Sequence, residues 1–153
     1  MEIERAGDVI PYVKKLIKKV NKTKAKFLPP KFCPVCKCPT IKEKDEAVLR
    51  CSNNSDCYAQ KLGRIIHFIS KKSLNIDGFG EKQAKQFYDL SFIRDIDDIF
   101  ELSNFKDQIL QLEGWGKTSY DNLIISVNNS KAITLNKLIY SLGIRYIGEI
   151  NSD

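Results

Sequence analysis

The stretch Phe32-Cys33-Pro34-Val35-Cys36 begins a set of four cysteines that Cys51 and Cys57 complete, in the spacing C-x2-C-x14-C-x5-C. This spacing is typical of a tetrahedral site in which four thiolates hold one Zn²⁺ ion. Four cysteine ligands leave no open position for water or substrate, so we expect a structural zinc. Residues 32–57 are too few to bury a core, and metal binding must therefore stabilise this segment.

Two other residues near this set could in principle bind the metal. Cys38 follows Cys36 by two residues and could compete as a ligand, but we interpret it as a spare thiol. His67, the single histidine of the chain, lies ten residues after Cys57 on a predicted helix, where packing is a more common role than metal binding. The alternative for the four cysteines themselves is a set of buried free thiols.

The composition is that of a folded chain. With 153 residues, 42% of them hydrophobic and 29% charged, the sequence is long enough for one ordinary domain or two small ones. It has no apolar run long enough to span a bilayer and no signal-like N-terminus, so we expect a cytoplasmic protein without a membrane partner. In that reducing compartment, cysteines are metal ligands or free thiols more often than disulfides.

The charge is unevenly distributed. The chain carries a formal net charge of +6, and residues 1–72 hold 17 Lys or Arg against 7 Asp or Glu, whereas residues 73–153 hold 8 against 12. A basic half favours a partner rich in phosphate. For a charge run alone, a solvated lysine-rich surface is the simpler explanation.

A glycine motif recurs in the second half of the chain. It occurs as Ile76-Asp77-Gly78-Phe79-Gly80 before a predicted helix over 81–90, and as Leu112-Glu113-Gly114-Trp115-Gly116 before one over 117–127. A looser third copy, over 142–148, follows a predicted helix over 134–142, and its second helix would begin near Glu149. The copies predict an internal repeat of helix-hairpin-helix units.

The remaining elements complete a mainly α chain. We expect one or two strands within residues 1–20 around a Gly7-Asp8 turn signal, and then a proline-rich linker. A helix is predicted over 58–72, because its apolar residues fall on one helical stripe, and Gly63 could cause a bend or a late start; the stripe consists of Tyr58, Leu62, Ile65, Ile66 and Ile69. Short helices are predicted over 93–102 and around 105–112. The predicted domains are 1–28, 29–60 (the zinc finger) and 61–153 (the helix-hairpin-helix region).

The glycine motifs predict an anion site. The first glycine permits a positive φ angle, the second opens a helix, and the backbone N–H groups there, together with the helix dipole, suit a phosphate group. We expect Ile76, Phe79 and Trp115 to pack inside the hairpins rather than stack on bases. Contacts of this kind position DNA without reading its sequence. The predicted DNA-binding residues are Gly78, Gly80, Lys82, Gly114, Gly116, Lys117, Gly143, Arg145 and Gly148.

The sequence offers no catalytic residues that we can identify. It lacks a Ser/His/acid set, and no G-x-x-x-x-G-K-[ST] or G-x-G-x-x-G loop is present. Asn75-Ile76-Asp77-Gly78 faintly resembles an adenylation motif, but asparagine stands where the nucleophilic lysine must be. We therefore expect no covalent nucleotide adduct on this chain.

Together these residues resemble the C-terminal half of bacterial NAD-dependent DNA ligases. The stretch from Glu4 to Pro11 is similar to the closing strand of their oligonucleotide-binding (OB) domain, and 32–36 with 50–60 are similar to their zinc finger. The stretches 67–71 and 76–80 are similar to a first helix-hairpin-helix unit, 112–119 to a second, and 130–131 with 142–149 to a third. Lys37 departs from the family pattern, which usually has glycine after the second cysteine.

The resemblance implies a zinc-finger and hairpin region that helps a ligase to encircle nicked duplex DNA in replication and repair. NAD and Mg²⁺ would belong to the whole ligase, whose adenylating lysine lies upstream. The chain would then be an excised fragment or a truncated gene product, inactive alone, monomeric and nucleoid-associated. A separate polypeptide carrying the adenylation half would be a further partner.

Two other functions compete with this interpretation. One is a protein-interaction module in which zinc stabilises the finger and the apolar hairpin faces bind another chain; weak salt dependence of DNA binding would favour it. The other is a stand-alone enzyme such as a glycosylase, which would need a catalytic Asp or Lys in a pocket beside a hairpin.

Overall fold

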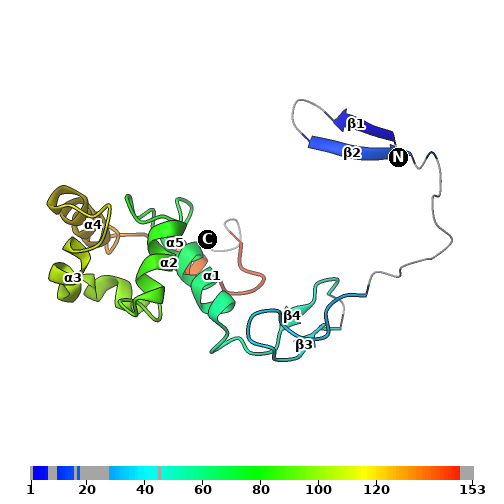
Figure 1. Cartoon of the computed structure of the whole chain (residues 1–153), viewed down its shortest axis with the longest axis horizontal. Coiled ribbons are helices and arrows are strands. Elements are labelled where there is room, and N and C mark those ends of the chain that lie inside the picture. The colour runs from blue at the N-terminus through cyan, green and yellow to red at the C-terminus, as the bar shows by residue number, and fades with distance from the viewer. Residues whose placement is uncertain (1, 7–9, 16, 18–27, 45, 149–153) are drawn as a thin grey trace. The chain divides into compact units, whose positions relative to one another are not determined.

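The computed structural model describes residues 2–6, 10–15, 17, 28–44 and 46–148. The chain divides into two compact units, Met1–Pro30 and Lys31–Asp153, and each is described by itself. Figure 1 labels the strands β1 to β4 and the helices α1 to α5. The predicted Gly7-Asp8 turn and the predicted helix from Glu149 lie outside the described residues.

The first unit contains a pair of antiparallel strands, β1 (Glu2–Ala6) and β2 (Ile10–Lys15), as the sequence predicts. The Tyr12 hydroxyl donates to a Glu4 carboxylate oxygen at 2.9 Å, and Lys14 forms an ion pair with the same oxygen at 2.9 Å. Ile3 and Val13 face each other in the register, yet they are 61% and 59% exposed. Two strands with exposed apolar side chains are marginally stable in isolation, so this pair suits a larger sheet.

The second unit begins with a small sheet. Strand β3 (Thr40–Ile41) pairs antiparallel with β4 (Arg50–Cys51), and an isolated bridge joins Phe32 to Pro39. The pairing places Thr40 opposite Cys51 and so brings the second half of the cysteine set beside the first.

The other regular elements that the structure describes in the second unit are helices. They are α1 (Tyr58–Ile69), α2 (Glu81–Asp89), the 3₁₀ helix η1 (Asp97–Phe105), α3 (Lys106–Leu110), α4 (Lys117–Asn129) and α5 (Leu135–Ser141). The mainly α character is confirmed, and Gly63 does not delay the start of α1. No helix in the described ranges is long and apolar enough to cross a membrane.

The short helix predicted over 93–102 is present, but its predicted bounds are wrong. The element there is the 3₁₀ helix η1, which begins at Asp97. The Asp98 carboxylate accepts hydrogen bonds from the backbone N–H groups of Arg94, at 2.7 Å, and Asp95, at 3.0 Å. A short acidic side chain that binds preceding amides favours a turn over a continuous helix, and this delays the helix start.

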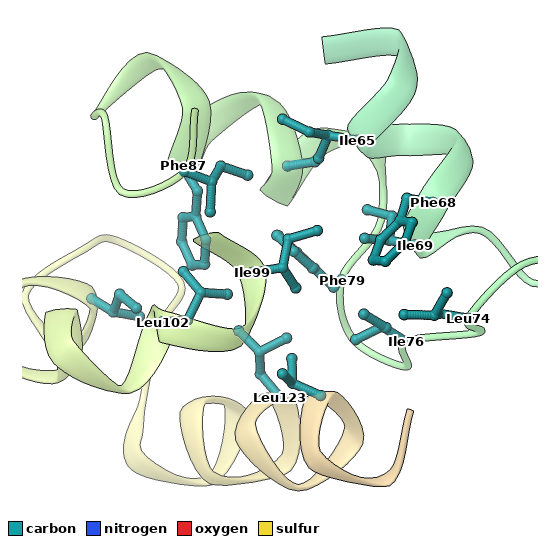
Figure 2. Packing of buried hydrophobic residues seen from close by; sticks show 14 of the residues in the cluster. Ile65, Phe68, Ile69, Leu74, Ile76, Phe79, Phe87, Ile99, Leu102 and Leu123 are labelled. Atoms are coloured by element: carbon teal, nitrogen blue, oxygen red, sulfur yellow. The ribbon is translucent and has the colours of Figure 1, made fainter. Parts of the chain in front are cut away.

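One hydrophobic core joins helices α1 to α4. Figure 2 shows Ile65, Phe87, Ile99 and Leu123, which come from four different helices, pointing into the same interior. The predicted stripe on α1 is confirmed, because its residues Leu62, Ile65 and Ile69 are buried. The other buried members of the core are Phe68, Leu74, Ile76, Phe79, Ala84, Ile93, Leu102, Ile109, Trp115, Tyr120 and Val127.

We expect the replacement Leu123→Ala to lower the free energy of unfolding by about 2–5 kcal/mol, because it leaves a cavity in this core. Leu123 is fully buried on α4, whereas Ile125 of the same helix is 57% exposed. The matched change Ile125→Ala should therefore shift the free energy by less than about 0.5 kcal/mol. Urea unfolding followed by circular dichroism measures both, and equal effects would contradict the packing described.

Candidate metal centre and glycine turns

The sulfur atoms of Cys33, Cys36, Cys51 and Cys57 converge on one point. All four lie within 4.8 Å of one another. The Sγ atoms of Cys33 and Cys57 are 3.9 Å apart, and those of Cys36 and Cys51 are 3.3 Å apart. Four sulfurs around a zinc ion with bonds of about 2.3 Å would be separated by roughly 3.8 Å. The cysteine set therefore fits a tetrahedral zinc site with four thiolate ligands, and the zinc prediction is confirmed.

A tight turn positions the first two cysteines. The backbone N–H of Cys33 donates to the Cys38 carbonyl at 2.8 Å, and that of Lys37 donates to the Cys33 carbonyl at 3.0 Å. Lys37 has a φ angle of 61°, in the left-handed region that disfavours side chains. This conformation explains physically why glycine suits the position after the second cysteine.

The last cysteine links the metal site to the helices. Cys57 is fully buried and is the N-cap residue of α1. Two backbone N–H groups of α1, those of Gln60 and Lys61, donate to its carbonyl oxygen at 3.0 and 2.9 Å. The positive end of the helix dipole therefore lies beside a thiolate ligand, which is electrostatically favourable.

The thiol groups of the site respond differently to their surroundings. Hydrogen bonds from the backbone N–H groups of Cys36 and Val35 lower the pKa of Cys33 to about 6. Burial, followed by hydrogen bonding with Cys36, raises the pKa of Cys51 to about 12. A divalent cation held by all four sulfur atoms would displace the protons that these thiols carry.

Cys38 and His67, the two other residues considered as metal ligands, do not belong to the cluster of four sulfur atoms. The Asn53 side-chain amide donates to the Sγ atom of Cys38 at 3.7 Å. The His67 Nε2 atom is 2.9 Å from the Tyr140 carbonyl oxygen, and its ring lies 5.1 Å from the Tyr140 ring. His67 thus joins α1 to α5, in agreement with the packing role expected from the sequence.

The first two glycine motifs form matching turns, which we call the first turn (76–80) and the second turn (112–116). The N–H of Phe79 donates to the Ile76 carbonyl at 3.3 Å, and that of Trp115 donates to the Leu112 carbonyl at 3.1 Å. The third residue of each turn is a glycine, with φ angles of 77° at Gly78 and 84° at Gly114. These angles are typical of type II turns, which favour glycine at this position.

A helix begins directly after each of these turns. Gly80 is the N-cap residue of α2 and Gly116 is that of α4, and neither helix has a side-chain cap. The first hydrogen bonds within the helices run from Ala84 N–H to Gly80 and from Tyr120 N–H to Gly116. The backbone N–H groups at the start of each helix therefore have no partner within the helix and are left to bind an external acceptor.

The glycine faces are open. A Cβ atom added at Gly78, Gly114 or Gly116 would meet no other atom within 4 Å. Gly116 has a φ angle of −105°, so neither backbone conformation nor internal packing requires glycine there. Its missing side chain leaves room for an outside group. A cleft of about 480 Å³ lies between the two turns, and its lining includes Gly78, Gly114 and Lys82.

The third turn (144–148) has a different character. The N–H of Ile147 donates to the Ile144 carbonyl at 3.1 Å, so the residue equivalent to Gly78 and Gly114 is Tyr146, with a φ angle of 67°. Gly143, with a φ angle of 64°, precedes this turn and ends α5, where an added Cβ would meet the His67 ring at 3.3 Å. Gly143 thus serves the packing of α5 rather than the tip of a turn.

Residues of the third turn bind the zinc-finger segment. Arg145 forms an ion pair with Glu43, and the Tyr146 hydroxyl donates to a Glu46 carboxylate oxygen at 2.6 Å. Arg50 donates to the other oxygen of Glu46 at 3.1 Å. The Tyr146 and Arg50 hydrogen bonds lower the pKa of Glu46, which keeps its charge in this contact.

Sequence reasoning missed this contact between the third turn and the zinc finger. Aligning the three copies on their final glycines, Gly80, Gly116 and Gly148, would have placed Tyr146 at the glycine position. The acidic partners, by contrast, carry no sequence signal that would pair them with residues a hundred positions later.

Comparison with known proteins places these features in a family context. Residues 32–59 match the family model described as the NAD-dependent DNA ligase C4 zinc finger domain. The chain is 46% identical over 151 residues to a DNA ligase of Persephonella marina, covering 98% of this chain and 21% of that protein. A DNA ligase of Gluconobacter oxydans is 40% identical over 152 residues, covering 99% of this chain and 22% of that protein. The chain thus spans about a fifth of the length of these relatives, and the resemblance noted in the sequence is confirmed.

We expect Cys51→Ser to abolish zinc binding while the helical core remains folded, because the core has its own buried apolar residues. Elemental analysis of the purified protein measures the zinc, and circular dichroism measures the helices. The matched change Cys38→Ser should leave the zinc content unchanged. Zinc that survives the double change Cys51→Ser, Cys57→Ser would contradict the ligand assignment.

Replacing Lys37 by glycine should tighten zinc binding, because glycine relieves a left-handed strain of roughly 1 kcal/mol. Competition with a chelator of known affinity measures the gain. Lys37→Ala is the control: it removes the 2.9 Å hydrogen bond from Lys37 Nζ to the Pro34 carbonyl but keeps the strain. An equal gain from both variants would show that the side chain, and not the backbone, is responsible.

Proposed function

We propose that this chain, which carries the C4 zinc finger of NAD-dependent DNA ligases and resembles bacterial DNA ligases along 98% of its length, binds the backbone of nicked duplex DNA. Its first and second turns, each within a helix-hairpin-helix unit, would make the contacts. The observation that carries the proposal is the pair of open glycine turns, each followed by a helix without a side-chain cap.

The geometry of the turns supports a phosphate ligand. Free N–H groups and the positive end of a helix dipole meet at Gly80 and again at Gly116. Lys82 and Lys117 lie near the N-termini of α2 and α4. Their side chains are exposed and would add positive charge near the phosphates. Since backbone amides contact phosphates and not base edges, binding would not depend on DNA sequence.

We do not assign the third turn to DNA binding. Arg145 already pairs with Glu43, and the glycine position is filled by Tyr146, so a close approach of DNA backbone is hindered there. Of the predicted DNA-binding residues, we therefore assign Gly78, Gly80, Lys82, Gly114, Gly116 and Lys117 to DNA. Gly143, Arg145 and Gly148 belong to a segment whose observed contacts are with α1 and the zinc finger.

The cysteine site would act by holding structure. A bound Zn²⁺ supplies positive charge that keeps four thiolates together in a segment too small to fold on apolar burial. Cys57 then fixes the start of α1, and Glu43 and Glu46 hold the third turn. The metal would thereby keep the zinc finger in register with the helices that carry the two DNA-binding turns.

The wider role is proposed from the relatives. In a complete ligase this region would hold DNA during replication and repair, while NAD and Mg²⁺ would serve an adenylation domain elsewhere. The nicked form of the DNA, a monomeric state and a cytoplasmic, nucleoid-associated location stay predictions. The domain boundaries at 28 and 60 also stay predictions.

One observation favours the interaction module as a second candidate. Helix α5 carries Leu135 and Leu138, and Leu142 is its C-cap residue; these leucines share a helical spacing, and their side chains are 71%, 39% and 41% exposed. An exposed apolar stripe of this kind suits a protein partner. This surface is separate from the two glycine turns, so both functions could coexist in one chain.

We expect Gly116→Val to weaken binding to a nicked duplex by roughly tenfold or more, because the new side chain would block hydrogen bonds between amides and phosphate worth about 1.5–3 kcal/mol. The fold should survive, since the added Cβ meets no atom within 4 Å and φ is not positive. Fluorescence anisotropy at several salt concentrations measures the affinity, and circular dichroism measures the fold.

The matched control is Gly63→Val, an open position on α1 away from the turns, which should leave the affinity unchanged. Arg145→Ala should weaken DNA binding less than Lys117→Ala does, because Arg145 belongs to the third turn and not to the two proposed DNA-binding turns. The slope of log affinity against log salt should fall by roughly 0.9 for each phosphate that the variant no longer binds. Binding that ignores salt, or that requires one base sequence, would overturn the proposal and favour the interaction module.

A further inference from the structure

Two hydrogen bonds that involve side chains link the first turn to α4 and the second turn to α2. The backbone N–H of Asp77, in the first turn, donates to the Ser126 hydroxyl of α4 at 2.7 Å. The indole N–H of Trp115, in the second turn, donates to the Gln86 side-chain oxygen of α2 at 3.2 Å. Each turn is thus held by the helix that follows the other turn.

The arrangement is reciprocal and lies at the cleft between the turns. Gln86 and Trp115 both line that cleft, together with Gly78 and Gly114. The Trp115 ring also packs against the Phe87 ring of α2, with centroids 5.0 Å apart. Ser126 lies beside the first turn, in a second hollow lined by Asp77 and Gly78.

We propose that Ser126 and Gln86 are positioning residues that hold the two turns at a fixed separation, so that both grip the DNA backbone at once. This inference rests on the proposed function. Neither side chain needs to touch DNA: the Ser126 oxygen and the Gln86 oxygen accept hydrogen bonds from the turns themselves. Two turns of fixed spacing bind as one bivalent surface, because the second contact becomes intramolecular once the first has formed.

The burial of these residues fits a positioning role. Ser126 and Gln86 are half-buried and not part of the apolar core, so their replacement removes one hydrogen bond each and leaves the packing intact. A single hydrogen bond of this kind contributes only modestly to stability. The effect on DNA binding should therefore exceed the effect on the fold.

The experiment compares Ser126→Ala with Ser126→Thr, which keeps the hydroxyl acceptor. In Ser126→Ala we expect faster hydrogen exchange at the Asp77 amide, affinity for nicked duplex DNA lowered roughly twofold to tenfold, and a shallower salt slope. Ser126→Thr should restore all three. Asn128→Ala, an exposed change on the same helix, is the control and should alter none of them.

The salt slope distinguishes positioning from plain stability. A variant that is merely less stable loses affinity without changing the number of phosphates bound, whereas a loosened pair of turns binds fewer phosphates at once. Adding Gln86→Leu to Ser126→Ala should lower the slope further. An unchanged slope in both variants would overturn the inference.

The two proposals can fail separately. If the unmodified chain does not bind DNA, the proposed function is wrong, and with it the DNA part of this inference. Hydrogen exchange at the Asp77 amide still decides whether Ser126 holds the first turn. If the chain binds DNA and Ser126→Ala leaves both the exchange and the slope unchanged, the proposed function stands and the positioning role is wrong.

Discussion

The packing of aromatic rings around Phe87 is the interaction on which the glycine turns depend. This fully buried ring contacts Phe79 of the first turn, at a centroid distance of 5.5 Å, and Trp115 of the second, at 5.0 Å. One side chain of α2 therefore supports both turns from inside. Because the apolar residue of each turn points inward, the backbone N–H groups of the following helix are left to face outward, and a site built from rigid backbone is well preorganised for binding.

The metal site contributes a second, local constraint. The zinc-finger segment has few apolar residues to bury, so its order depends on thiolates held together by a cation. Its last ligand, Cys57, is also the N-cap residue of α1, and its acidic residues Glu43 and Glu46 bind the third turn. Removal of the metal should therefore affect both ends of the helical region while leaving the central core around Phe87 in place.

The three turns show how a repeated backbone motif can take different roles. Glycine at the third position of the first two turns leaves the tip bare, which permits close approach of another backbone. Tyr146 fills the same position in the third turn, and its hydroxyl, with the neighbouring Arg145, binds the zinc finger instead. The first two turns thus present an open, amide-lined surface, whereas the third turn, with Tyr146 at its tip and Arg145 beside it, makes a contact between two parts of the same unit.

The sequence by itself determined the zinc ligands, the α1 stripe and the first two turns, because each rests on local spacing or on a φ angle that glycine favours. It misplaced the element at 97–105, where the Asp98 carboxylate binds preceding amides and competes with helix propensity. Only the tertiary structure decided which residues link the turns. Ser126 and Gln86 look like ordinary polar helix residues, and Glu43 meets Arg145 across a hundred positions of chain. Such pairings depend on how the helices pack in space, and a local sequence pattern does not specify contacts between residues so far apart in the chain.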